Sequence, residues 1–247
     1  MTLGPRFLLA VVGLLAVGVL SMVAYDYWRC HRVEETLVKL PADDIPARPR
    51  LAAFARTRGE SQYMTSCAGC HGEHLQGDAA RGVPDLQDGT WLYGQGLVSE
   101  IESTIQYGIR SGHPRSRNLT DMPAYLRTGQ LTPAEIDDVV EYVLKLSDQP
   151  HDATAAQRGL GVYADKAHCW DCHGPDGLGN TDYGAPALTG AAWVYGGTRE
   201  ALRHSVAEGR HGLCPAWIDQ LSPAAIRELA VYLHSVSSRE ARATPAT

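Results

Sequence analysis

The chain has 247 residues, 44% of them apolar, which is enough to bury two small hydrophobic cores. Its net charge is −6 and it has no basic run, which argues against a nucleic-acid partner because binding phosphates needs clustered Lys and Arg. With 25 glycines and 7% aromatic residues, the sequence indicates two compact, loop-rich domains.

An apolar run, FLLAVVGLLAVGVLSMVAY at residues 7–25, carries no charge. A helix over this run spans roughly 28 Å, at about 1.5 Å per residue, which is close to the hydrocarbon thickness of a bilayer. The alternative is a cleaved signal peptide, but the run is long for one, and Tyr25, Tyr27 and Trp28 follow it as an interfacial aromatic belt. We therefore predict a retained transmembrane anchor at residues 1–28, followed by a Pro-rich spacer at residues 29–50.

The rest of the chain is duplicated. CAGCHG at residue 67 recurs as CWDCHG at 169, TWLYGQG at 90 recurs as AWVYGGT at 192, and QLTPAEIDDVVEYVLKLS at 130 recurs as QLSPAAIRELAVYLHSVS at 220. The duplication predicts two consecutive domains, residues 51–148 and 149–238, with a polar, disordered tail at residues 239–247.

Each copy closes with an amphipathic helix. In the first copy, Thr132, Pro133 and Glu135 form an N-cap, a first-turn proline and a capping-box glutamate, and apolar residues follow at helical spacing. The second copy repeats this pattern from Ser222 and Pro223. No run alternates polar and apolar residues for long enough to form a strand, so the sequence predicts an all-α fold.

Each copy also contains a Cys-x-x-Cys-His motif, the attachment signature of c-type haem, in which the two thiols form thioethers and the histidine binds the iron. A zinc site would need a second pair of ligands nearby, and a thioredoxin-like disulfide would need a parallel sheet. We therefore predict two covalently bound haem c groups in two tandem class I cytochrome c domains behind one transmembrane helix. The attaching residues are Cys67, Cys70 and His71 in the first copy, and Cys169, Cys172 and His173 in the second.

Haem is attached outside the cytoplasm, so we expect a single-pass protein of the inner (cytoplasmic) membrane with both haem domains in the periplasm. The charges beside the span favour the opposite orientation weakly, because Arg29, Arg32 and Lys39 follow it and only Arg6 precedes it. We expect the periplasmic orientation, because haem attachment requires it and the charge difference is small.

Each iron needs a sixth ligand or an open face. Met122, which lies downstream of His71 and just before a proline, is the predicted ligand of the first iron. DMPAYL at residue 121 aligns with LCPAWI at residue 213, and no methionine follows Met122, so Cys214 is the candidate for the second iron. A thiolate there would stabilise ferric iron and lower the potential of the second haem. The alternatives are an imidazole from His211 or His204, an open iron, or a disulfide that joins Cys214 to Cys30.

Six further side chains are candidates for holding the haem propionates through charge-assisted hydrogen bonds or ring N–H and O–H donors. Two of them are arginines that follow a glycine in each copy, and four are aromatic residues in the repeated Trp-x-Tyr motif. Ordinary packing is the alternative for all six. They are Arg110, Arg210, Trp91, Tyr93, Trp193 and Tyr195.

Together these motifs resemble a known family. WLYG, YGIRSGH and DMPAY, then GNTDYGAPALTG, WVYGG, GRHG and PAW behind an N-terminal anchor, are similar to the dihaem subunit III, or P subunit, of cbb3-type cytochrome c oxidases over about residues 50–238. The resemblance implies an electron-transfer subunit that is not an enzyme on its own. It also implies the catalytic and monohaem subunits of the oxidase as partners, and a soluble cytochrome c or the bc1 complex as electron donor.

The chain departs from that family in two places. Six residues precede the apolar run, where the family usually has a longer stretch, and Cys214-Pro215 stands where the family has Met-Pro. Two other functions fit the motifs: a membrane-tethered dihaem shuttle for another periplasmic enzyme, and a haem peroxidase or gas sensor that uses an open second haem.

Overall fold

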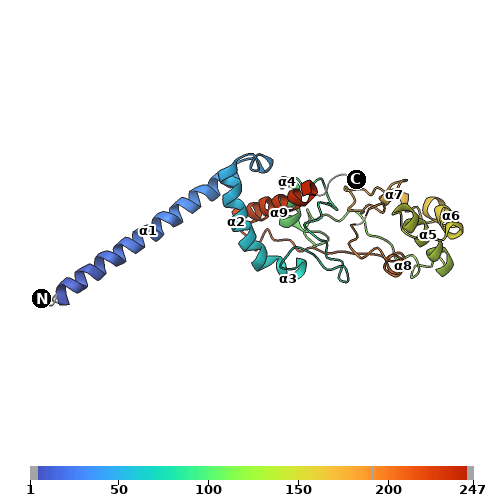
Figure 1. The fold of residues 1–247 in the computed structure, drawn as a ribbon, viewed down its shortest axis with the longest axis horizontal. Coiled ribbons are helices and arrows are strands. Elements are labelled where there is room, and N and C mark those ends of the chain that lie inside the picture. Colours follow the sequence, from blue (N-terminus) through green and yellow to red (C-terminus); the bar gives the residue numbers. More distant parts are fainter. Residues whose placement is uncertain (1–4, 191, 244–247) are drawn as a thin grey trace.

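The computed structural model describes residues 5–190 and 192–243, which form helices joined by long loops (Figure 1). Within these residues there are isolated β-bridges but no strand, so the predicted all-α fold is confirmed. In chain order the elements are α1 (Pro5–Lys39), η1 (Ala42–Asp44), α2 (Pro49–Ser66), α3 (Ala68–His71), α4 (Val98–Tyr107), α5 (Pro133–Leu146), α6 (Ala153–Gly161), η2 (Val162–Lys166), α7 (Trp170–His173), α8 (Arg199–Glu208) and α9 (Pro223–Ala243).

Helix α1 extends away from the rest of the molecule (Figure 1). Its segment Val11–Lys39 holds a window long and apolar enough to cross a membrane, and none of that window is buried in the protein. The helix does not end at residue 28 as predicted but continues to Lys39. Glu35 pairs there with Arg32 and Lys39, each at 3.6 Å and one helical turn away, and such pairs stabilise a helix.

The predicted spacer is folded onto the body that follows it. Leu37 and Ile45 are fully buried. Arg227 of α9 donates to the carbonyls of Leu37 and Leu40, at 3.0 and 2.9 Å, and so satisfies carbonyl groups at the end of α1. Residues 29–50 therefore form a fixed joint between the anchor and the rest of the chain, which the Pro-rich composition did not predict.

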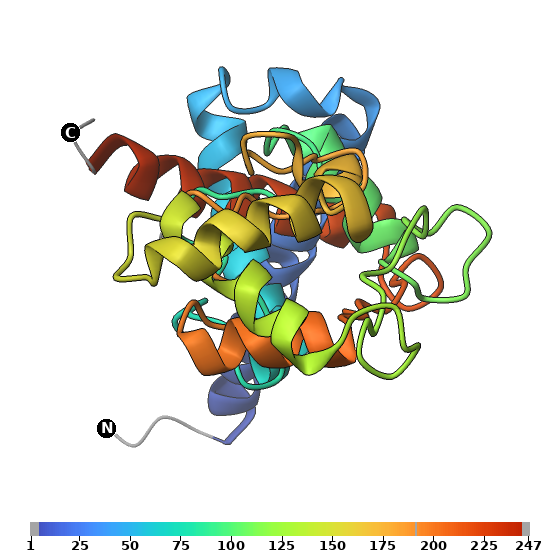
Figure 2. The ribbon, with the colours of Figure 1, turned by 90° about the vertical axis from the view of Figure 1, so that its right-hand side faces the viewer.

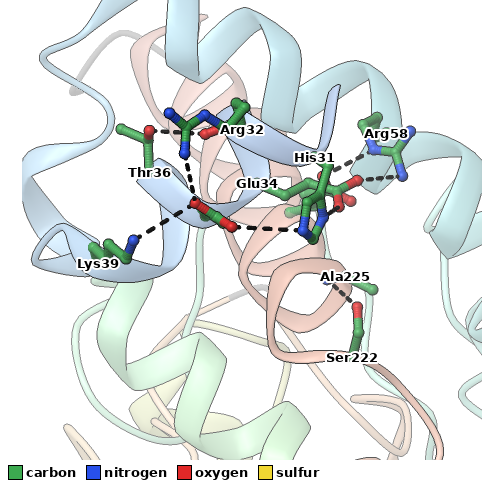
Figure 3. Close-up of polar contacts among 10 residues, drawn as sticks. His31, Arg32, Glu34, Thr36, Lys39, Arg58, Ser222 and Ala225 are labelled. Atoms are coloured by element: carbon green, nitrogen blue, oxygen red, sulfur yellow. Dashed lines mark hydrogen bonds and ion pairs between the residues drawn. The ribbon is translucent and has the colours of Figure 1, made fainter. Parts of the chain in front are cut away.

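A second contact at this joint is an arginine between two carboxylates (Figure 3). Arg58 of α2 lies 2.8 Å from Glu34 of α1 and 2.9 Å from Glu228 of α9. Glu228 is 3% exposed, and burial raises its pKa to about 7 although Arg58 acts in the opposite direction. Three helices from three parts of the chain are thereby joined at one point.

The helices divide into two bodies, each with its own buried core. The core of the anchor-side body is drawn from residues 37–105 and 217–236, and in this body α2 and α4 pack on α9. The outer body is the continuous stretch of residues 122–208, in which α5 packs on α6 and α8. The outer body lies at the end of the molecule away from α1, and it faces the viewer in Figure 2.

This division differs from the expected consecutive domains, residues 51–148 and 149–238. The closing helix of each sequence copy packs on the opening helix of the other copy, at a glycine in both bodies. A Cβ on Gly59 would lie 2.2 Å from the Glu228 carbonyl oxygen, and one on Gly159 would lie 2.0 Å from that of Asp138. The two helix crossings are equivalent. Each body therefore has the same packing of an opening helix on a closing helix, although the two helices come from different sequence copies.

The end of the chain also differs from the prediction. Residues 239–243 of the expected disordered tail are helical, because α9 runs on to Ala243. Residues 244–247 lie outside the described part of the chain.

Candidate functional site

The two Cys-x-x-Cys-His motifs form the short helices α3 and α7, which follow the opening helix of each copy. The Tyr63 hydroxyl donates to the Gly72 carbonyl at 2.6 Å, and the Tyr163 hydroxyl donates to that of Gly174 at 2.5 Å. Both glycines have positive φ, +81° and +78°, and turn the chain directly after the histidine. The proximal side is therefore built in the same way in both bodies.

Each motif histidine is oriented by a backbone carbonyl. His71 Nδ1 lies 3.3 Å from the Pro84 oxygen, and His173 Nδ1 lies 2.9 Å from the Pro186 oxygen. Burial lowers the pKa of both imidazoles, although these carbonyl bonds act in the opposite direction. A neutral ring that donates from Nδ1 keeps the Nε2 lone pair available for a metal.

The motif thiols are free to form thioethers. All six cysteines are unpaired, so neither Cys67 with Cys70 nor Cys214 with Cys30 forms a disulfide. Burial raises the pKa of Cys67 and Cys169 to about 11, so both are neutral thiols. Two thiols and one neutral imidazole in each body are the donor set that covalent haem c requires, and the residues fit that group.

The loops that carry the candidate sixth ligands cross between the bodies. Ile109 and Cys214 exchange two backbone hydrogen bonds of 2.9 Å, and Met122 and Arg210 exchange two of 3.2 and 3.1 Å. A Cβ on Gly108 would meet the Cys214 carbonyl oxygen at 2.4 Å. In the matched position, a Cβ on Gly209 would meet the Met122 carbonyl oxygen at 2.5 Å. Each distal loop is thus held by the glycine turn of the other copy.

As a result, each candidate distal residue lies near the motif of the other sequence copy. Met122 packs against the outer core, together with Cys169, and the Tyr125 hydroxyl donates to the Ala167 carbonyl at 3.0 Å. Cys214 lies beside the first motif, where its thiol and that of Cys70 contribute to the raised pKa of Cys67. The sequence had assigned Met122 to the iron of His71 and Cys214 to that of His173. Packing brings Met122 to the second motif and Cys214 to the first.

The two alternative imidazoles face solvent or pair with another group. His204 lies exposed on α8, and His211 Nδ1 pairs with Asp121 Oδ2 at 2.9 Å. The Cys214 thiol stands in the position that Met122 has in the other body. Burial raises the pKa of the Cys214 thiol to about 11, and the neighbouring Cys70 thiol raises it further.

The two candidate arginines are not equivalent. Arg210 lies over the Tyr195 ring at 4.1 Å and donates from Nε to Ser205 Oγ at 2.9 Å. Arg110 instead donates to the Asp121 carboxylate and to the carbonyls of Gly212 and Thr120. It is therefore engaged by protein groups.

The residue in the place of Arg210 in the other body is Arg117. Its guanidinium lies over the Tyr93 ring at 5.2 Å, and its Nε donates to Thr104 Oγ1 at 3.1 Å. Sequence comparison missed Arg117 because it lies in the longer segment SGHPRSRNLTD of the first copy. Aligning Gly108 with Gly209 would have shown that Arg110 has no matching arginine.

The four candidate aromatic residues pack against glycines. A Cβ on Gly184 would lie 2.2 Å from the Tyr93 ring, and one on Gly82 would lie 2.0 Å from the Tyr195 ring. These contacts run between the bodies in both directions. Trp91 and Trp193 pack within their own loops, Trp91 against Gly96 and Trp193 against Gly197. The structure thus gives each ring a packing role, and contact with a propionate stays a prediction.

Comparison with known proteins agrees with the motifs. The sequence matches the family model for cytochrome c over residues 56–147, and the model for cytochrome c oxidase, cbb3-type, subunit III, over residues 154–233. The cbb3-type cytochrome c oxidase subunit CcoP of Cereibacter sphaeroides is 38% identical over 84% of this chain and 70% of its own length. CcoP of Rhodobacter capsulatus is 41% identical over 83% of this chain and 70% of its length, and subunit FixP of a Bradyrhizobium species is 41% identical over 78% and 65%.

Two predictions are settled by these matches. The chain contains two cytochrome c units with covalently bound haem c as the implied cofactor, and it acts in electron transfer within an oxidase complex rather than as a separate enzyme. The apolar helix α1 agrees with a membrane anchor on such a subunit. The chain belongs to the subunit III family of cbb3-type cytochrome c oxidases.

Proposed function

We propose that this chain is a single-pass inner-membrane protein that carries two haem c groups in the periplasm. It receives electrons from a soluble cytochrome c or the bc1 complex and delivers them to the monohaem and catalytic subunits of a cbb3-type oxidase. The observation that carries the proposal is the matched pair of motifs, each with a carbonyl-oriented histidine. Haem c, when attached there, supplies a carrier that gains and loses one electron.

The number of haems is tested by counting them. Acid-acetone extraction followed by a pyridine haemochrome assay should leave about two c-type haems on each polypeptide. Replacing Cys67 and Cys70 by Ala should leave one, and so should replacing Cys169 and Cys172. One haem or none on the unmodified chain would refute the dihaem proposal.

Location and partners are tested in membranes. Protease added to intact spheroplasts should digest the haem bodies, whereas a periplasmic orientation would be excluded if digestion required membrane rupture. A haem–copper subunit should co-purify with the chain from native membranes. Its absence would favour a tethered shuttle for another enzyme.

We further propose that the distal residues serve the haems in exchanged order: Met122 with His173, and Cys214 with His71. Support comes from the packing of Met122 and Cys169 against the same outer core, and from the closeness of Cys214 to Cys67 and Cys70. Thr120 lies beside the second motif, where its hydroxyl bond partly offsets the effect of burial on the pKa of Cys172. The anchor-side haem is then the one with the unusual sulfur ligand.

The exchanged order can be tested by marking one haem. Replacing Cys70 by Ala leaves a single thioether on the anchor-side haem, whose remaining vinyl group moves its α-band to longer wavelength. Adding Cys214→Met should then change the potential of the marked haem, and adding Met122→Leu should change that of the unmarked one. The reverse result would restore the order expected from the sequence.

A further inference from the structure

One carboxylate stands between the two distal loops. Asp121, the residue before Met122, accepts a hydrogen bond from Arg110 Nε on one oxygen and pairs with His211 Nδ1 at 2.9 Å on the other. Arg110 follows Ile109, which pairs with Cys214, and His211 follows Arg210, which pairs with Met122. The Asp121 carboxylate therefore contacts Arg110, next to the residue that pairs with Cys214, and His211, next to the residue that pairs with Met122.

Arg110 extends the same connection to both loops. Its side chain is 11% exposed, and it donates to the Gly212 carbonyl at 2.8 Å and to the Thr120 carbonyl at 2.9 Å. These carbonyls lie two residues before Cys214 and Met122, respectively. Its backbone has a φ of +49°, which is uncommon for a residue other than glycine.

The connection has no duplicate in the repeat. The residue that matches Asp121 in the second copy is Leu213, which is 66% exposed. The residue that matches Arg110 is His211, and it binds the same carboxylate. A single carboxylate thus contacts both distal loops, whereas two independent copies would each have a carboxylate of their own.

We propose that Asp121 is a positioning residue that sets the placement of Met122 and Cys214 together, so that one substitution alters both haems. This inference rests on the exchanged distal order proposed above. A residue that served only its own loop would affect one haem. Asp121 contacts both loops, and removing its carboxylate takes a partner from Arg110 and from His211 at the same time.

The test uses the full-length chain with both haems attached, in the Cys70→Ala background that marks the anchor-side haem. Asp121→Ala should shift the midpoint potentials of the marked and unmarked haems and increase carbon monoxide binding at both α-bands. Asp121→Asn, which keeps an acceptor but loses the charge, should shift both in the same sense by less. The matched control is Asp137→Ala, which removes an exposed pair with Arg203 and should move neither haem.

A shift confined to one haem, no shift, or an equal shift from Asp137→Ala would overturn the inference. If Asp121→Ala does not retain two haems, Asp121→Asn gives the same reading. The exchanged order is judged separately by Met122→Leu in the same background. If that variant changes the marked haem, the distal order is wrong. If it changes the unmarked haem while Asp121 variants change one haem or none, only the positioning role fails.

Discussion

The anchor-side and outer bodies share their helix crossing and differ in what covers it. In the outer body, Arg158 beside the crossing glycine pairs with Asp138, whose side chain is 15% exposed, against 3% for Glu228 in the matching pair. In the anchor-side body, Arg58 pairs with Glu228, and Glu34 of the anchor adds a second carboxylate on the other side of Arg58. The same contact is a surface ion pair in one body and part of the joint to the membrane helix in the other.

The bodies differ again at the distal side. Their proximal sides match, from the tyrosine bond to the glycine carbonyl to the histidine held by a proline carbonyl. On the proposed distal order, the distal residue is a thioether in the outer body and a thiol in the anchor-side body. Duplication thus supplied two equal scaffolds, and the anchor and one sulfur residue made them unequal.

The largest expected effect is on the haem beside Cys214. On the proposed distal order Cys214 binds iron as an anionic thiolate, and exchanging that thiolate for a neutral thioether favours ferrous iron, so Cys214→Met should raise the potential of the anchor-side haem. We expect on the order of 100 mV, where each 59 mV corresponds to about 1.4 kcal/mol. Redox titration at the marked α-band measures the shift, and Cys214→Ala should open that iron to carbon monoxide. If neither substitution moves the potential or the spectrum, Cys214 is not a ligand.

The next effect concerns the helix crossings. Gly59→Ala and Gly159→Ala each place a Cβ against a backbone oxygen, at 2.2 and 2.0 Å, so the helices must move apart. We expect each to lower the free energy of unfolding by about 1–3 kcal/mol or more. Thermal unfolding of the haem-loaded protein measures this. Gly161→Ala on the same helix as Gly159 is the control, since nothing lies within 4 Å of its Cβ. Equal stability of all three variants would mean that the crossings are looser than described.

The covered and open ion pairs should also respond differently to pH. The pKa of Glu228 is raised from 4.5 to about 7, so the folded state keeps its proton to a higher pH than the unfolded state does. Stability from this group is present below about pH 4.5 and is lost as the pH rises to about 7. Glu228→Gln should therefore reduce the fall in unfolding free energy between pH 5 and 8, by up to about 3 kcal/mol. Asp138→Asn is the control. An unchanged slope in Glu228→Gln would show that Glu228 titrates normally.

Sequence reasoning succeeded where the signal was local. The capping box of Thr132 and Glu135 is present, and α5 begins at Pro133 as expected. The two motifs with His71 and His173 also form matched proximal sites.

The sequence could not predict which copy supplies the closing helix of each body. Gly59 and Gly159 make equivalent crossings, so a repeat pattern cannot distinguish exchanged from consecutive packing. Arg117, not Arg110, takes the place of Arg210, and the extra residues of the first copy obscure that alignment. Arg227 contacts the end of α1 although the two are far apart in the sequence. These contacts depend on tertiary structure.

The smallest effect is expected for the open ion pair of the outer body. Arg158 donates to Asp138 at 2.8 and 2.6 Å, but both side chains are partly exposed, so solvent screens the pair and ordering the arginine side chain opposes it. A double-mutant cycle with Arg158→Met and Asp138→Asn should give a coupling of about 0.2–1 kcal/mol, decreasing at high salt. The same cycle with Arg58→Met and Glu228→Gln should give a larger coupling, because removing Arg58 leaves Glu228 buried without its cation. If the two couplings are equal, covering by the anchor is not what distinguishes the bodies, and the asymmetry resides in the distal sulfur alone.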